Sequence, residues 1–164
     1  MFRDMRRKKQ LLTEEKTVEI LQRGTAGTLA LMGDGGYTYS LPISYVYDAG
    51  KIYFHCANAG HKLDAIEKHD KVSFSVIDEN VVVPEEYTTY FRSAVVFGKI
   101  RVIREEAEKR RTLEILAAKF SPDHEEGRRK EIDDQLARVT MLELTIDHMS
   151  GKEAIELVKK VDRE

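Results

Sequence analysis

The sequence has no tryptophan, a single cysteine and only three prolines in 164 residues. The single cysteine, Cys56, cannot form an internal disulfide and has no second thiolate with which to build a structural zinc site. We expect no metal site. A chain with this cysteine usage suits the reducing interior of a cell, so a cytoplasmic protein is the expectation.

Long apolar runs and internal repeats are also missing. No run approaches the ~20 residues that span a bilayer, and the start MFRDMRRKKQ lacks the apolar stretch of a signal peptide. We therefore expect neither a membrane helix nor a signal peptide. The length, with 41% hydrophobic and 34% charged side chains, suits one domain over residues 1–164.

The charge balance gives no general reason to expect a nucleic-acid partner. The chain has 27 basic and 29 acidic residues, for a net charge of −2. Basic residues gather only in the first ten positions, at Arg3, Arg6, Arg7, Lys8 and Lys9. Because such a basic terminal segment is usually solvated or forms ion pairs within a dimer, nucleic-acid binding is a distant alternative.

Alternation and turn signals predict a mainly β protein. The expected strands are 28–32, 37–48, 51–57, 71–78, 93–103 and 139–146, and Gly98 indicates a bulge or a close backbone approach in the fifth of them. The expected helices are 13–23, 61–69, 104–120, 124–138 and a terminal helix from about Gly151. Residues 79–92 are expected to form a loop broken at Pro84. About six strands with peripheral helices indicate a small antiparallel barrel.

Reactive side chains gather where the expected strand 51–57 meets the expected helix 61–69. In the segment HCANAGHK, residues 55–62, the backbone N–H groups near Gly60 lie at the positive end of the helix dipole. Gly60 leaves room for an anion, and His61 and Lys62 can donate to it. These features outline a phosphate site. The alternative is that Lys62 is an ordinary solvated lysine.

Three stretches carry a resemblance to a known family: FHCANAGHK (54–62), SLPIS (40–44) and FRSAVVFGKIRVI (91–103). They resemble the FMN-binding split barrel of the pyridoxamine 5′-phosphate oxidase superfamily. The details LPISYVYDAGKIYFHCANAGHKLD, RSAVVFGKI and DHMSGKEA are most similar to its nitroimidazole antibiotic resistance proteins. Together the similar stretches cover most of residues 5–155.

The resemblance implies a homodimeric, antiparallel split β-barrel with FMN at the subunit interface. Residues 40–43 would line the isoalloxazine ring, residues 60–62 would hold the phosphate, and Ser93 would reach across the interface. The positions that would bind the cofactor are Ser40, Leu41, Pro42, Ile43, His55, Cys56, Gly60, His61, Lys62 and Ser93.

The same residues also have simpler interpretations. Pro42 can mark nothing more than an edge strand, although an interrupted ladder also offers backbone groups to a flavin ring. His55 can be a half-buried histidine satisfied by a neighbour, which makes flavin contact a better hypothesis for it than catalysis. Cys56 is typical of a small buried hydrophobe, and nothing nearby favours a reactive thiolate. The catalytic residues stay unassigned.

Departures from the family limit the function. The vitamin-oxidising members use a C-terminal pattern that includes tryptophan, which this chain lacks, and Tyr45 stands where their flavin strand continues with lysine. True pyridoxamine phosphate oxidation is therefore disfavoured. The resemblance suggests instead a reductase that acts on nitro compounds or another small oxidant.

Two functional classes stay open. In one, FMN accepts electrons from NAD(P)H or another donor and passes them to a small acceptor. In the other, the dimer holds a flavin without turnover, as a redox sensor or carrier. The chain has no G-x-G-x-x-G fingerprint of a separate dinucleotide domain, but an FMN barrel does not need one.

Three aromatic residues in the expected loop 79–92 allow two hypotheses. Tyr87, Tyr90 and Phe91 could cover the flavin or the substrate across a dimer interface, because loops on a rigid barrel commonly shape such sites. They could equally be aromatic residues of an interface or a core. They are not counted among the predicted site residues.

Overall fold

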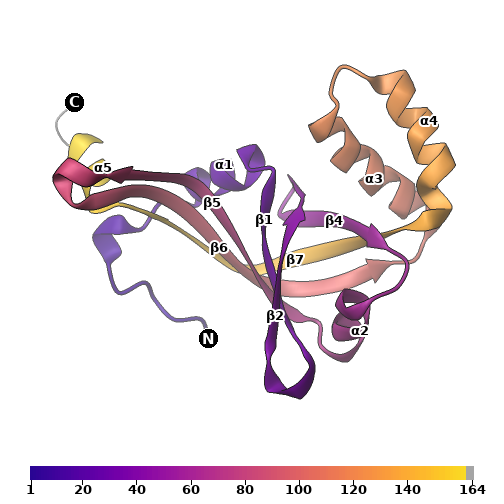
Figure 1. Cartoon of the computed structure of the whole chain (residues 1–164), viewed down its shortest axis with the longest axis horizontal. Coiled ribbons are helices and arrows are strands. Elements are labelled where there is room, and N and C mark those ends of the chain that lie inside the picture. The colour runs from indigo at the N-terminus through magenta and orange to yellow at the C-terminus, as the bar shows by residue number, and fades with distance from the viewer. Residues whose placement is uncertain (162–164) are drawn as a thin grey trace.

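The computed structural model describes residues 1–161. In this part of the chain, seven strands form one strongly curved antiparallel sheet with helices around it (Figure 1). The strands are β1 (Ala26–Met32), β2 (Thr38–Ser44), β3 (Val46–Asp48), β4 (Lys51–Ala57), β5 (Lys71–Val83), β6 (Thr88–Ile103) and β7 (Val139–Glu153). The prediction of a mainly β, antiparallel fold is confirmed.

The two edges of the sheet are consecutive in the chain. The strand order is β2-β1-β5-β6-β7-β4-β3, so β2 ends one edge and β3 begins the other. Tyr45, which is fully buried, joins them, and its N–H donates to the Thr25 carbonyl at 3.2 Å. No ladder of hydrogen bonds joins the two edges of the sheet, and only the chain at Tyr45 connects them. This arrangement is a split barrel. The expected strand 37–48 divides at Tyr45, which explains why there are seven strands and not about six.

Most of the expected helices are present. The helices are α1 (Glu14–Arg23), α2 (His61–Lys68), α3 (Glu106–Phe120), α4 (Glu125–Gln135) and α5 (Ile155–Val161). Thr13 caps α1 by accepting a hydrogen bond from the Lys16 N–H, and Gly24 is its C-cap. The α3–α4 hairpin stands over one end of the sheet, and α2 lies at its lower side (Figure 1).

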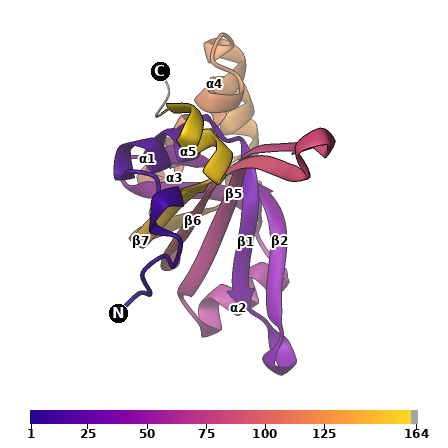
Figure 2. The same ribbon diagram turned by 90° about the vertical axis from the view of Figure 1, so that its left-hand side faces the viewer.

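The prediction of a loop at 79–92 is wrong. β5 and β6 continue past the barrel as a paired hairpin, from Glu79 opposite Arg92 to Val83 opposite Thr88. Pro84 begins the short turn that closes the hairpin, where its missing N–H disturbs no ladder. This projection, residues 79–91, is called the arm below. Figure 2 shows it leaving the body of the molecule.

The long β6 strand also explains a second correction. The expected helix from Gly151 does not start there, because β7 continues to Glu153 by pairing with the first part of β6. The helix begins instead at Ile155. The expected bulge at Gly98 is confirmed, since the β6–β7 register shifts between Phe97 and Gly98. A Cβ at Gly98 would lie 2.1 Å from the Thr145 carbonyl oxygen, so only glycine fits.

Two hydrophobic clusters lie on opposite sides of β4. Ile52 and Phe54 point into the core inside the curved sheet, together with residues of α1 and α2. Tyr53 points to the outer face, where it packs in a second cluster with Leu113 and Leu116 of α3. This alternation places side chains of β4 in two different environments.

Candidate functional site

The joint between β4 and α2 has the backbone of an anion site. Gly60 precedes the helix with φ of +132°, a conformation that residues with a side chain rarely adopt. No side chain caps this helix end, and the Gly60 carbonyl accepts from the N–H of Leu63. The N–H groups of His61 and Lys62 therefore lie in the first turn, where a helix cannot satisfy them internally.

His61 connects this joint to strand β2 and its hairpin. Its ring stacks on Tyr39 of β2 with 4.2 Å between the ring centroids. Its Nε2 lies 3.5 Å from Oδ2 of Asp34, which also accepts a hydrogen bond from Lys68 at 2.9 Å. The Lys68 ammonium lowers the pKa of Asp34. The start of α2 is thus held against the strand predicted to line the flavin.

Lys62 is half-buried and acts electrostatically on Cys56. Burial raises the pKa of the Cys56 thiol, and the nearby Lys62 ammonium opposes this shift without reversing it. Cys56 is therefore a neutral thiol at pH 7 and not a thiolate nucleophile.

Strand β2 presents two kinds of side chain. Leu41 and Ile43 pack against the core, whereas Ser40 and Pro42 are exposed. β2 is an edge strand, as the simpler interpretation of Pro42 expected. An edge strand carries a row of backbone N–H and C=O groups that its own sheet does not pair. The edge-strand interpretation of Pro42 is therefore confirmed, and the offer of backbone groups to a flavin ring stays a prediction.

The structure does not bring every predicted residue to one surface. His55 is exposed on the outer face of β4, whereas Cys56 packs against the core inside the sheet. Ser93 lies in a different part of the sheet, between Ile77 of β5 and Lys152 of β7, at the base of the arm. Within one chain, the joint and β2 form the assembled part of the predicted site.

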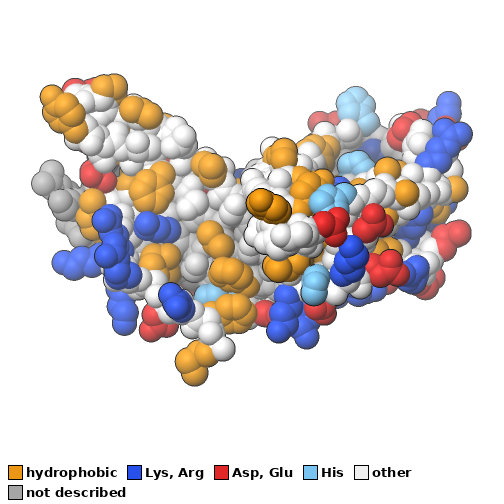
Figure 3. Space-filling model, turned by 60° about the horizontal axis from the view of Figure 1, so that its bottom comes forward, with side chains coloured by type: hydrophobic (Ala, Val, Ile, Leu, Met, Phe, Trp, Pro, Cys, Tyr) orange, Lys and Arg blue, Asp and Glu red, His pale blue; other side chains and the backbone are white. Residues whose placement is uncertain are grey.

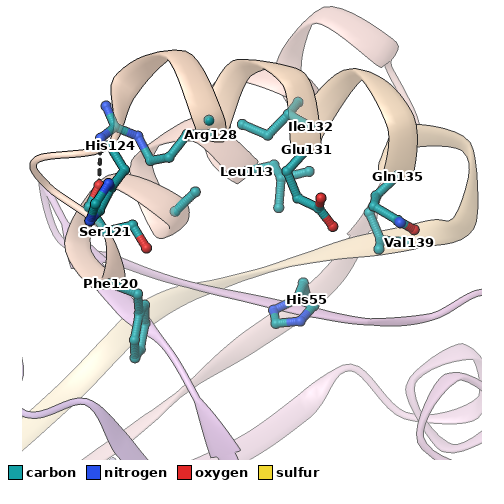
Figure 4. A pocket seen from close by; sticks show the side chains of 12 residues that line it. His55, Leu113, Phe120, Ser121, His124, Arg128, Glu131, Ile132, Gln135 and Val139 are labelled. Atoms are coloured by element: carbon teal, nitrogen blue, oxygen red, sulfur yellow. Dashed lines mark hydrogen bonds between the residues drawn. The ribbon is translucent and has the colours of Figure 1, made fainter.

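His55 opens onto a cavity that the sequence analysis missed. The cavity has a volume of about 490 Å³ and lies between the α3–α4 hairpin and the outer face of β4. Its apolar walls are Leu113, Ala117, Phe120, Ile132 and Val139. Figure 4 shows His55 alone on the floor, below the helices. The apolar face of α3 was visible in the sequence, but not the strand that it would cover.

Polar groups stand at both ends of this cavity. Arg128 donates to the Ser121 carbonyl at 2.6 Å and lies 3.2 Å from Oε1 of Glu114, next to His124. Gln135 lies at the other end, and between the two ends the Glu131 carboxylate points down toward His55 (Figure 4). An apolar slot with polar groups at its ends is typical of a small-molecule site.

Residues 1–161 were also searched for a metal site and for a membrane-spanning helix. There, no group of three histidine, cysteine or acidic side chains is placed to hold a metal ion. None of the helices in the same range has the length and hydropathy needed to cross a bilayer.

Comparison with known proteins identifies the family. The family model described as pyridoxamine 5′-phosphate oxidase matches residues 13–153, which is most of the chain. The chain belongs to this family. A search of the curated proteins finds no match.

Several solved structures share the fold of this chain. A Bacteroides thetaiotaomicron protein, whose name assigns it to 5-nitroimidazole antibiotic resistance, is 20% identical over 87% of this chain and 86% of its own, with a TM-score of 0.74. The FAD and haem binding protein of Mycobacterium smegmatis is 26% identical over 89% and 73%, with a TM-score of 0.73. The flavocytochrome Anf3 of Azotobacter vinelandii is 21% identical over 92% and 72%, with a TM-score of 0.77. The predicted family is confirmed.

Proposed function

We propose that this pyridoxamine 5′-phosphate oxidase family member is a cytoplasmic, homodimeric flavoprotein that binds FMN and reduces a small acceptor, such as a nitro compound, with electrons from NAD(P)H. The observation that carries the proposal is the uncapped start of α2 at Gly60, held against the edge strand β2 by the stack of His61 on Tyr39. Flavin is also the cofactor that the names of several structural neighbours state.

Each part of this arrangement suits one part of FMN. The N–H groups of His61 and Lys62, with the Lys62 ammonium, suit a dianionic phosphate at a helix N-terminus. The exposed edge of β2 over residues 40–43 offers backbone donors and acceptors to the polar edge of the ring. Ser93 would complete the site from the partner subunit, whereas His55, on the outer face of β4, lies outside this arrangement within one chain.

A bound flavin supplies the hydride chemistry, and the chain supplies its position. The buried Tyr45 fixes where β2 leaves the sheet, and the Tyr39–His61 stack fixes the distance from this strand to the phosphate site. Cys56, as a neutral thiol that faces the core, has no role in electron transfer in this proposal.

The first test is titration of the purified protein with FMN, FAD and riboflavin, followed by absorbance. We expect one FMN per subunit and steady NAD(P)H oxidation that a nitroimidazole acceptor stimulates. A protein that holds flavin but shows no steady turnover with any donor would be a flavin sensor or carrier. A protein whose spectrum and thermal stability do not respond to excess flavin would contradict the proposal.

The cavity above His55 favours a second candidate function, a flavocytochrome. The M. smegmatis neighbour is named for binding haem as well as FAD. In this chain, an exposed imidazole stands on the floor of an apolar cavity of about 490 Å³, and His124 and Arg128 lie at one end to meet acidic groups. If a haem occupied this cavity, His55 would be its iron ligand. A haem held there would supply one-electron chemistry.

This candidate predicts a specific effect of His55→Ala. We expect hemin added to the wild-type protein to give a Soret band typical of histidine-ligated iron, and the variant to lose most of this band because it lacks the ligand. His69→Ala, which removes an exposed histidine at the end of α2, is the matched control and should leave the band unchanged. Equal spectra for the two variants would exclude His55 as the ligand.

A further inference from the structure

We propose that the arm of one subunit closes the cavity above His55 in its partner, with Tyr87 at the mouth of that cavity. The inference rests on the homodimer of the proposed function, and it names the part of the second copy that completes the site. It does not depend on which ligand occupies the cavity.

One face of the arm is apolar and exposed in a single chain. Val81, Val82 and Tyr87 are 51%, 66% and 97% exposed, although valine and tyrosine favour buried strand positions. From Glu79 to Val83, β5 extends the arm by about 13 Å at 3.3–3.4 Å per residue. Hydrophobic side chains gather at this end of the molecule, in the upper left of Figure 3. Exposed apolar hairpins of this kind are interaction surfaces or aggregation sites.

The arm cannot reach the cavity of its own chain. Figure 1 shows the arm at one end of the longest axis and the α3–α4 hairpin, which covers the cavity, at the other. A two-fold symmetry axis that crosses the middle of the molecule, perpendicular to its longest dimension, brings each arm to the partner's α3–α4 hairpin. The same two-fold symmetry covers both exposed arms and both open cavities. The assembly therefore stops at a dimer, because no arm or cavity is left free to bind a further copy.

The charges of the two surfaces are complementary. Residues 80–91 contain Glu85 and Glu86 and no lysine or arginine. One end of the cavity carries His124 and Arg128, and the Arg128 guanidinium donates to the Ser121 carbonyl and lies 3.2 Å from the Glu114 carboxylate. An arm with an acidic tip would therefore meet the cavity at the end that carries these two side chains.

The absence of tryptophan makes a direct test possible. In Tyr87→Trp, the indole is the single tryptophan of the protein and reports its own surroundings. We expect a blue-shifted emission and several-fold weaker acrylamide quenching than in the matched control Tyr37→Trp, whose tyrosine is 80% exposed at the tip of the β1–β2 hairpin. When the dimers are diluted until they dissociate, the two variants should have the same emission wavelength and the same acrylamide quenching.

A second substitution locates the surface that covers the indole. Ala117→Phe fills part of the cavity from α3 with an apolar side chain. When Ala117→Phe is combined with Tyr87→Trp, the indole emission should return to the wavelength of a solvent-exposed tryptophan. The sedimentation coefficient should still be that of a compact, folded protein. Ala118→Phe, on the same helix but absent from the cavity lining, is the control for the added bulk.

The outcomes separate the two proposals. A monomer at all concentrations would overturn the homodimer, and the arm contact with it. A dimer in which the Tyr87→Trp indole is as exposed as that of Tyr37→Trp would overturn the arm contact alone. A shielded indole that Ala117→Phe and Ala118→Phe affect equally would place the arm on another surface, and would also overturn the inference.

Discussion

Lys62→Ala is expected to bind FMN about 10- to 150-fold more weakly than the wild-type protein, which corresponds to the ~1.5–3 kcal/mol of a hydrogen bond to a charged group. Lys62 lies in the first turn of α2, after the uncapped Gly60, where an ammonium and free N–H groups can share one phosphate. Because Lys62 is at the rim of the fold, the melting temperature without FMN should change little. The rise in melting temperature on adding FMN should shrink.

Riboflavin tests the phosphate assignment because it lacks the phosphate. If Lys62 meets that group, the variant should bind riboflavin as the wild type does. Lys71→Ala is a matched control, because this exposed lysine follows α2 at the start of β5. It should leave FMN affinity unchanged. Equal losses for FMN and riboflavin in Lys62→Ala would show that Lys62 supports the ring or the joint, and the phosphate assignment would fail.

The β4–α2 joint was predictable because its signals are local. The alternation of KIYFHCA and the glycine before a charged, apolar-striped segment indicate a strand that enters a helix, and the structure has both elements within a residue of the expected bounds. The same alternation places His55 and Cys56 on opposite faces of β4, because successive side chains in a strand point to opposite faces. The prediction that both residues contact the flavin did not take these opposite faces into account.

The cavity and the arm could not be predicted in the same way. The cavity exists because Leu113 and Ile132, which are about 20 residues apart on two helices, pack over a third segment at His55. No local pattern specifies that meeting. The arm was missed because Pro84 suggests a break, and because VVV followed by PEEYTTYF has no alternation that would favour a strand. Pairing across the hairpin overrides these weak local preferences.

The second large effect concerns the support of the cavity roof. Glu143 on β7 is 2% exposed and accepts hydrogen bonds from Lys51 at 2.9 Å and Arg101 at 2.8 Å. Arg101 also bonds Glu108 of α3 at 2.5 Å, so it connects the sheet to the helix that covers the cavity. Burial alone would raise the pKa of Glu143, but the two cations hold it below its ordinary value.

Arg101→Met should therefore lower the free energy of unfolding at pH 7 by about 1.5–3 kcal/mol, since Glu143 would keep only one partner for a buried charge. Deuterium exchange should also become faster in residues 106–135, because α3 loses its connection to the sheet. Because the folded-state pKa of Glu143 is depressed, its contribution is present above the ordinary value of 4.5 and is lost as the pH falls through the folded-state pKa. The difference between wild type and variant should consequently narrow in acid.

Arg110→Met is the matched control for this prediction. Arg110 forms an ion pair with Asp133 at 2.6 Å, between α3 and α4, but the two side chains are 47% and 63% exposed. An exposed pair of this kind contributes about 0.2–1 kcal/mol, so the control should be less destabilised, and its difference from wild type should not depend on Glu143. Chemical denaturation of both variants at pH 7 and pH 4 separates the cases. Equal destabilisation of the two variants at pH 7 would show that the Glu143 network does not support the roof of the cavity.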